Sequence, residues 1–328
     1  MKIKYDKVII WGHPLFSHTH SYVHEAYFKA FKHMGYDVYW FHDDDCPDDF
    51  DFSNCLFIGE GFADKKIPLN ESSCYLIMYC PSPEKYVGKV GRYIDIRMAA
   101  VDFKDHIQEY SFDKIETINV GPACYFAPKK DSTIHVKNDY VDYEIEDFDT
   151  MYISWATNLL PEEFNFEDVY FPRENIIYFC GNLCPNGLCE NVSTFRPFVN
   201  ECQKNGIGFV HNNSWTNPLS SEEVILRTKR SALGIDIRGP QHLKQQLITC
   251  RVFKNISYGQ LGLTNSPKIN EVMDGNCVFN SDTAQLFYDG MNQRNDYEKI
   301  KTAMKFVRDN HTYINRINSI LSVVSDEY

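Results

Sequence analysis

The sequence predicts an α/β protein of two domains, each built on a parallel sheet. Three observations support this prediction. The chain has 328 residues, which is roughly the length of two ordinary domains. Short apolar runs that end in glycine or polar turns alternate with helical patterns, as they do in β-α-β units. This alternation begins near residue 7 and starts again near residue 175.

The first half opens with a β-α-β unit. The apolar run 7–12 predicts a buried strand, and 21–35 predicts a helix that ends at Gly35. The run 36–41 predicts the next strand. Further short apolar runs predict strands at 55–59, 74–80 and 115–121, and 149–164 predicts a strand followed by a loop that stops at Pro161.

The second half repeats this architecture without repeating the residues. Strands are expected at 175–182, 207–213, 232–237 and 261–266, and helices at 192–206, 220–231 and within 249–260. The segment 296–324 is a long helical pattern with a break near His311. We therefore expect domains at 1–165 and 166–305, facing a cleft, and a C-terminal helix at 306–328 that crosses back to the first domain.

Composition excludes several classes of protein. The net charge of -12, a pI near 5.4 and the lack of a basic tract argue against nucleic acid as the main partner. The sequence has no apolar run of membrane-spanning length, and the N-terminus does not resemble a secretion signal. Eleven scattered cysteines indicate reduced thiols rather than disulfides. We expect a cytoplasmic protein without an integral membrane segment.

The segment 249–265 contains the strongest candidate site. Thr249 can cap a helix whose first turns present Arg251 and Lys254 on one face. Arginine grips a phosphate with two parallel hydrogen bonds and lysine neutralises it as a point charge, so the pair can hold a diphosphate. From spacing alone a solvated helix face is the more common interpretation. The flanking apolar strands favour the site, because they place the helix at the carboxyl edge of a sheet.

Other turns of the second half can complete this pocket. Arg238 follows a strand just before the helix, although it can equally belong to a simple connecting loop. Gly181 and Asn182 follow the first strand of the second half, where backbone and amide can meet a phosphate. Trp215 can stack on a nucleobase or be an ordinary aromatic residue. The end of the helix supplies the last four candidates: Ser257, Tyr258, Gly259 and Gln260.

The first half offers a candidate base. Four histidines, His13, His18, His20 and His24, lie between the first strand and its helix. A neutral histidine can take a proton from a sugar hydroxyl, and Glu60, after another strand, can orient that histidine or act as the base itself. A structural role is the alternative for each histidine. No third zinc ligand is evident from the spacing, so no metal site is assigned.

The acidic run "HDDDCPDD" at 42–49 has two interpretations. One is the Asp-x-Asp metal motif of single-domain sugar transferases, and the more common one is a solvated loop. The run "GEGFAD" is an incomplete G-x-G-x-x-G pattern in poor strand-turn-helix context, which disfavours a nicotinamide enzyme.

Several segments together resemble GT-B glycosyltransferases, and most closely the glycosyl transferase family 1-like group found in bacteria and large DNA viruses. They are "DIRGPQHLKQQLITCRVFKNISYGQLGLTNS", "NHTYINRI", "SHTHSYVHEAYFKAFKHMGYDVYWF", "FIGEGFADKKIPL" and "SWATNLLPEEF". The resemblance implies two Rossmann-like domains. It also implies a nucleotide-sugar donor, such as a UDP- or GDP-sugar, in the second domain, an acceptor such as a glycan or glycoprotein in the first, and no cofactor or essential metal.

Carried over by position, Arg251 and Lys254 match the cations that neutralise the leaving diphosphate, and Gly181 matches the glycine turn beside them. The E-x7-E element of many retaining members is missing, which favours inverting transfer. The resemblance thus implies a hexosyl- or pentosyltransferase. The candidate catalytic residues are His20, Glu60 and His18. A non-catalytic sugar-nucleotide or glycan-binding protein of this fold and a sugar-nucleotide epimerase are the alternatives.

Overall fold

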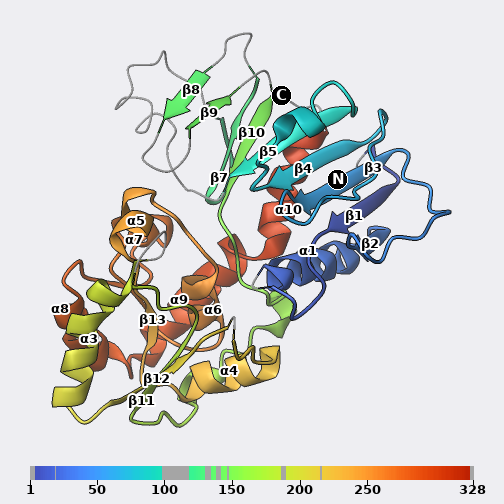
Figure 1. Cartoon of the computed structure of the whole chain (residues 1–328). Coiled ribbons are helices and arrows are strands. Elements are labelled where there is room, and N and C mark those ends of the chain that lie inside the picture. Colours follow the sequence, from blue (N-terminus) through green and yellow to red (C-terminus); the bar gives the residue numbers. More distant parts are fainter. Residues whose placement is uncertain are drawn as a thin grey trace. The chain divides into compact units, whose positions relative to one another are not determined.

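The computed structural model describes residues 4–18, 20–97, 118–129, 134–137, 142–145, 148–185, 190–214 and 216–325. The chain divides into two compact units. Unit 1 contains Met1–Ser154 and Ile314–Tyr328, and unit 2 contains Trp155–Tyr313. Both units combine helices with parallel strands (Figure 1), so the α/β class is confirmed. The sequence predicted domain boundaries near residues 165 and 305. In the structure, the boundaries between the two compact units lie at 154/155 and 313/314.

Unit 1 is built on an eight-stranded sheet with the order β2-β1-β3-β4-β5-β10-β7-β6. The neighbours from β2 to β10 are parallel, whereas β7 and β6 are added antiparallel. The strands are β1 (Lys7–Trp11), β2 (Val38–Phe41), β3 (Cys55–Glu60), β4 (Cys74–Met78), β5 (Arg92–Arg97), β6 (Ile118–Gly121), β7 (Cys124–Ala127) and β10 (Asp149–Ile153). A separate antiparallel pair consists of β8 (Ile134–Lys137) and β9 (Asp142–Ile145).

The predicted strands of the first half occur in this sheet, and the sequence did not predict its strands β5 and β7 or the antiparallel pairing of β6 and β7. Of the predicted strand 115–121, the structure describes 118–121 as β6, which pairs with β7 through a tight turn. Residue Ala123 in this turn has a φ of 52°, a left-handed conformation that apolar periodicity does not reveal. Residues 115–117 lie outside the described residues.

Helix α1 (Ser21–His33) follows β1 and ends where the sequence predicted. Its apolar residues recur at helical spacing and are buried, namely Val23, Ala26, Tyr27, Ala30 and Phe31. Gly35, with a φ of 82°, takes the left-handed conformation that follows many helices. Helix α1 starts immediately after the histidine-rich loop, so that loop is fixed at one end by β1 and at the other by α1.

Helix α10 (Tyr313–Val324) belongs to unit 1 although α9 (Tyr297–Asn310) belongs to unit 2. The fully buried Arg316 fixes α10 there. Its guanidinium donates to the carbonyl oxygens of Ser154 at 2.9 Å and Pro122 at 2.8 Å, and to the Ser154 hydroxyl at 3.0 Å. The predicted return of the C-terminal helix to the first domain is confirmed. The predicted break at His311 also occurs, between α9 and α10.

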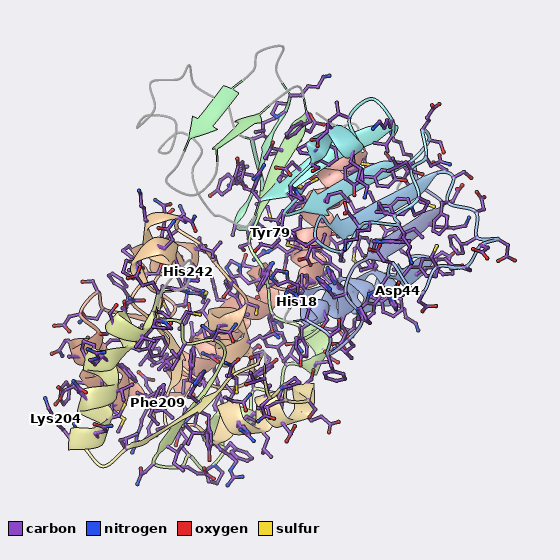
Figure 2. All side chains as sticks on the ribbon, viewed as in Figure 1. His18, Asp44, Tyr79, Lys204, Phe209 and His242 are labelled. Atoms are coloured by element: carbon purple, nitrogen blue, oxygen red, sulfur yellow. The ribbon has the colours of Figure 1, made fainter. Side chains whose placement is uncertain are left out.

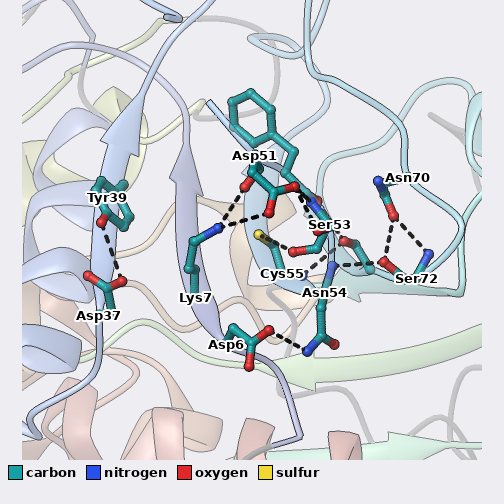
Figure 3. A network of polar contacts seen from close by, with 12 residues as sticks. Asp6, Lys7, Asp37, Tyr39, Asp51, Ser53, Asn54, Cys55, Asn70 and Ser72 are labelled. Atoms are coloured by element: carbon teal, nitrogen blue, oxygen red, sulfur yellow. Dashed lines mark hydrogen bonds and ion pairs between the residues drawn. The ribbon is translucent and has the colours of Figure 1, made fainter. Parts of the chain in front are cut away.

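A polar network closes the edge of the unit 1 sheet where the parallel strands begin (Figure 3). Lys7 at the start of β1 donates to the Asp51 carbonyl at 2.9 Å. Asn54, just before β3, donates its side-chain amide to Asp6 at 2.9 Å and its backbone N–H to Ser72 at 2.8 Å. These bonds stabilise the connections at this edge. The opposite edge, where the strands end, is the place at which α/β sheets bind ligands.

Unit 2 has two small parallel sheets. Strands β11 (Ile176–Cys180) and β12 (Gly208–Asn212) form one, and β13 (Gly234–Asp236), β14 (Gly262–Thr264) and β15 (Val278–Phe279) form the other. The helices are α3 (Val192–Lys204), α4 (Ser221–Arg230), α5 (Pro240–Lys244), α6 (Arg251–Ser257), α7 (Pro267–Val272) and α8 (Thr283–Gln293), followed by α9. The core contains fully buried aromatic residues from three helices and β11, namely Phe179, Phe198, Phe253 and Phe287.

The described part of the chain contains no helix that is both long and apolar enough to cross a membrane.

Candidate functional site

Unit 2 contains a site that we call the arginine pocket, formed by Gly181, Asp236, Arg238, Thr249 and Arg251. Each residue comes from the carboxyl end of a strand or the start of a helix. Gly181 follows β11, Asp236 ends β13, and Arg251 begins α6. The predicted helix of the 249–265 segment is confirmed, and it lies between β13 and β14 as the sequence indicated.

Two guanidinium groups share one carboxylate in this pocket. The fully buried Asp236 accepts from Arg238 Nε at 3.0 Å, and its other oxygen lies 2.5 Å from Arg238 Nη2 and 3.6 Å from Arg251 Nη1. The Arg238 side chain is 4% exposed, whereas that of Arg251 is 24% exposed. Among the described residues of the pocket, one positive charge is left in excess, and Arg251 is the arginine that a ligand can reach.

Arg251 is held in a defined position. Its guanidinium stacks over the Phe179 ring, 4.4 Å from the centroid. It also lies against Gly181, where a Cβ atom would come far closer to Arg251 Nη2 than the 3.0 Å that real Cβ atoms keep. Gly181 has a φ of 155°, a further reason for glycine there. The glycine therefore lets the arginine approach the end of β11.

Burial lowers the pKa of Arg251, and Arg238 acts in the same direction, whereas Asp236 opposes both. An arginine still keeps its charge at pH 7. Burial and the neighbouring Arg238 also lower the pKa of His242, on α5, to about 4. His242 is therefore neutral at pH 7, and the excess charge of the pocket is carried by the arginines.

The predicted role of Thr249 as a helix cap is wrong. The cap position of α6 is Cys250, and no side chain caps the helix. Instead, the Thr249 hydroxyl accepts a hydrogen bond from Arg238 Nη2 at 2.6 Å. Thr249 thus belongs to the pocket, but it orients the buried arginine rather than the helix.

The residues at the end of α6 have partners elsewhere in unit 2. The Ser257 hydroxyl is 2.7 Å from that of Thr157, and the Tyr258 hydroxyl donates to Asn158. Gln260 is buried and donates its amide to the carbonyl oxygens of Thr228 and Ser231, at 2.7 and 2.8 Å. These three predicted donor-binding residues therefore make structural contacts.

Gly259 is also explained by packing. It has a φ of 86°, and a Cβ atom there would lie 3.1 Å from the Asp168 carbonyl oxygen.

Lys254 lies one helical turn after Arg251 and is half-buried. Asn182 has a buried side-chain oxygen with no hydrogen-bond partner in the described chain. Trp215 lies outside the described residues.

Unit 1 contains a second site, which we call the histidine cluster: His13, His18, His20, His24 and Glu60. Figure 2 labels His18 and Tyr79 on unit 1 and His242 on unit 2. Glu60 ends β3, and the histidines occupy the loop after β1 and the start of α1. Around the buried Glu60 carboxylate, His20 Nδ1 lies at 2.7 Å, His24 Nε2 at 3.4 Å and His13 Nε2 at 3.7 Å.

The backbone fixes this cluster. Gly12 leaves the space that His24 occupies, because a Cβ atom there would overlap the imidazole. His24 Nδ1 accepts from the His13 backbone N–H at 3.1 Å, and His18 Nδ1 accepts from that of His20 at 3.2 Å. Tyr79, which follows β4 with a φ of 53°, stacks on the His20 ring at 5.3 Å. His20 is thus held between an aromatic ring and a carboxylate.

The surroundings shift the pKa values of the Glu60 carboxylate and of two of the imidazoles, His13 and His18. Burial alone would raise the pKa of Glu60, but hydrogen bonds and charge interactions with His20 and His24 outweigh it and hold this pKa well below its usual range. Burial, followed by the neighbouring His20 and His13, lowers the pKa of His18 to about 4. Burial also lowers the pKa of His13. Glu60 is consequently a weak base at pH 7.

The acidic loop at 42–49 has a structural function at Asp43. One carboxylate oxygen accepts from Trp11 Nε1 at 3.1 Å and from the Lys66 backbone N–H at 3.0 Å, and the other accepts from the Lys65 backbone N–H at 3.0 Å. Asp44 pairs with the Lys66 ammonium at 3.1 Å. These contacts favour the solvated-loop interpretation over a metal motif.

The sequence named Glu60 as a carboxylate that can orient a histidine, and Glu60 bonds His20 at 2.7 Å, but the other partners in the two sites were not predicted. Asp236 reads as an ordinary strand residue in "GIDI", and its importance depends on two arginines from other elements. Phe179 and Tyr79 read as core aromatic residues. His13 and His24 were recognised only as part of a histidine-rich loop, because the carboxylate that they share, Glu60, is 47 and 36 residues further along the chain (60 − 13 and 60 − 24).

Searches against protein-family models and against curated proteins find no match. Solved structures similar to this chain include T4 phage beta-glucosyltransferase, with 13% identity over 98% of this chain and 97% of that chain and a TM-score of 0.45. The same protein in complex with its UDP-glucose substrate matches at 12% identity, equal coverage and a TM-score of 0.43.

Another similar structure is an alpha,alpha-trehalose-phosphate synthase (UDP-forming) from Burkholderia vietnamiensis. It has 9% identity over 93% of this chain and 77% of that chain, and a TM-score of 0.42.

Proposed function

We propose that this chain is a glycosyltransferase that moves a sugar from a nucleotide-sugar donor to a hydroxyl group of an acceptor. In this proposal the arginine pocket binds the donor diphosphate, and the histidine cluster supplies the base. The observation that carries the proposal is the charge balance of the arginine pocket, where one carboxylate faces two guanidinium groups and the accessible one is Arg251.

A diphosphate fits this pocket for three reasons. Its oxygens can take two parallel hydrogen bonds from a guanidinium, which gives both geometry and charge compensation. Gly181 has no side chain, so a ligand can come close to the backbone beside Arg251. The unpartnered side-chain oxygen of Asn182 lies in the next position, and a ribose hydroxyl or a base N–H can satisfy it.

The cations also account for the leaving group. When the sugar leaves the donor, negative charge develops on the diphosphate, and Arg251, with Lys254 one turn further on, stabilises that charge without a metal ion. The nucleotide base and the sugar, hexose or pentose, are left open. The acidic net charge of -12 favours a glycan or glycoprotein acceptor over nucleic acid.

The geometry favours His20 over Glu60 as the base. Glu60 is ionised, buried and bonded to His20 Nδ1 at 2.7 Å. In the tautomer in which Nδ1–H donates to Glu60, Nε2 carries the lone pair that accepts a proton. His20 then takes the acceptor hydroxyl proton as the oxygen attacks the anomeric carbon in line. The bond from that carbon to the diphosphate breaks, and its electron pair leaves with the diphosphate. This route inverts the anomeric configuration.

The test is release of the nucleoside diphosphate from UDP-, GDP- and dTDP-sugars, with and without a panel of glycan acceptors and with chelator present. We expect one donor to be turned over by the wild type and not by Arg251→Ala. Lys204→Ala is the matched control, because it removes a cation from the exposed end of α3, well apart from His242 in Figure 2.

Three results would contradict the proposal. Full activity of Arg251→Ala would remove the pocket from the reaction. Saturable donor binding without turnover for any acceptor would indicate a binding protein. Conversion of the donor to another sugar nucleotide without an acceptor would indicate an epimerase.

A further inference from the structure

The histidine cluster has more ligand atoms than an acid–base pair requires. One ligand atom each from His13, His18 and Glu60 lies within 4.8 Å of the other two. These residues come from the loop after β1 and from the end of β3, which are adjacent and parallel in the sheet. His20 and His24 border the same carboxylate.

Several polar atoms in the cluster lack a partner. In the described chain, the buried His13 Nε2 has no hydrogen-bond partner, and the buried His24 Nε2 and Glu60 Oε2 lie 3.4 Å apart without a well-formed hydrogen bond. The side chains of His24 and Glu60 are each 1% exposed, so water does not readily satisfy them. Buried polar atoms without a partner cost free energy, and an observed group of them indicates a ligand that binds there.

We propose that His13, His18 and Glu60 bind a divalent transition-metal ion of the Zn²⁺ class, with at least one coordination position left open. Two imidazole nitrogens and a carboxylate oxygen are ligands that zinc accepts, whereas magnesium prefers oxygen alone. Bond lengths of about 2.1 Å place tetrahedral ligand atoms roughly 3.4 Å apart, so rotation of the imidazoles brings these atoms to an ion.

The ligand atoms come from two imidazoles and one carboxylate, the side chains that a transition-metal ion binds in their neutral and ionised forms respectively. His18 Nδ1 accepts the His20 backbone N–H at 3.2 Å, so a neutral His18 carries its proton on Nε2, and coordination of the ion by His18 has to replace this hydrogen bond.

The ion and the proposed base share one carboxylate. Glu60 Oε1 accepts from His20 Nδ1 at 2.7 Å and lies 3.7 Å from His13 Nε2. Binding of the ion does not depend on the proposed function, because the proposed base His20 is not one of its three ligands.

The test uses the full chain, freed of metal with chelator and without any donor. Titration with Co²⁺ should give the intense visible absorption of a tetrahedral complex at one ion per chain, and Zn²⁺ should displace it, as followed by calorimetry. His13→Ala and His18→Ala should each weaken Zn²⁺ binding by more than the roughly 10- to 100-fold that loss of an outer partner costs. His33→Ala, at the exposed end of α1, should bind as the wild type does.

Circular dichroism and thermal unfolding in chelator show whether each variant folds. If one of the two variants does not fold, the Zn²⁺ affinity of the other one tests the proposed ligands. The Co²⁺ spectrum of the wild type tests ion binding without either variant. A wild type that binds neither ion below millimolar concentration, or folded ligand variants with wild-type affinity, would overturn the proposal. Because no substrate is present, this result is separate from the outcome for transferase activity.

Discussion

Gly181→Ala tests the arginine pocket without removing a charge. The added methyl group would overlap Arg251 Nη2 and lie 3.4 Å from the Phe179 ring, so the guanidinium has to leave its position. The cation remains in the protein but no longer lies where a diphosphate would bind. A hydrogen bond to a charged group contributes about 1.5–3 kcal/mol, so affinity for a nucleoside diphosphate should fall roughly 10- to 150-fold.

The assay is calorimetric titration of UDP, GDP and dTDP into the wild type, Gly181→Ala, Arg251→Ala and the double variant. Because both substitutions disrupt the same contact, the double variant should bind no more weakly than Arg251→Ala. Gly206→Ala is the matched control, since its φ is also positive, at 68°, and a Cβ atom there meets nothing within 4 Å. The reasoning is refuted if Gly181→Ala binds the nucleotide as tightly as Gly206→Ala does.

Three further predictions concern catalysis, the C-terminal helix and pH. Glu60→Gln should lower the rate of transfer while leaving donor affinity unchanged, because the amide keeps the shape of Glu60 but not the charge that orients His20. A variant whose donor affinity falls as much as its transfer rate would argue against a base at this site. Arg316→Met should destabilise unit 1 by about 3 kcal/mol in urea unfolding, because Ser154 and Pro122 lose the donor that α10 supplies. A change no larger than that of Arg308→Met, whose side chain is partly exposed, would contradict this. The pKa of His242 is about 4 in the folded protein and about 6.5 in the unfolded chain, so it contributes stability above pH 6.5 that is lost as the pH falls towards 4. His242→Gln should remove up to about 3 kcal/mol of this pH dependence of the unfolding free energy. Parallel curves of unfolding free energy against pH for the wild type and the variant would contradict this.

The alternation of strands and helices could be predicted from the sequence because it depends on local periodicity. The strand and helix patterns of unit 1 gave β1, α1 and the next strands with nearly correct bounds. The break at His311 was readable from the interrupted helical pattern. The Arg316 contacts that join α10 to unit 1 were not, because their acceptors lie about 160 and 190 residues earlier in the chain.

For the same reason, only some residues of each candidate site could be predicted from the sequence. Arg251 was found because it begins a helix between two predicted strands. The end of that helix was assigned to the donor, but Ser257 and Tyr258 bond Thr157 and Asn158, 100 residues away. Distant pairing of this kind leaves no local pattern, so spacing cannot separate a buried structural residue from one that faces a ligand.

The most direct test of the proposed donor site is a crystal structure of the full chain with UDP, or with whichever nucleoside diphosphate binds best in calorimetry. We predict diphosphate oxygens about 3 Å from the Arg251 guanidinium and beside the Gly181 backbone, with Arg238 still bonded to Asp236. A nucleotide bound elsewhere, with no phosphate oxygen in contact with Arg251, would contradict the assignment.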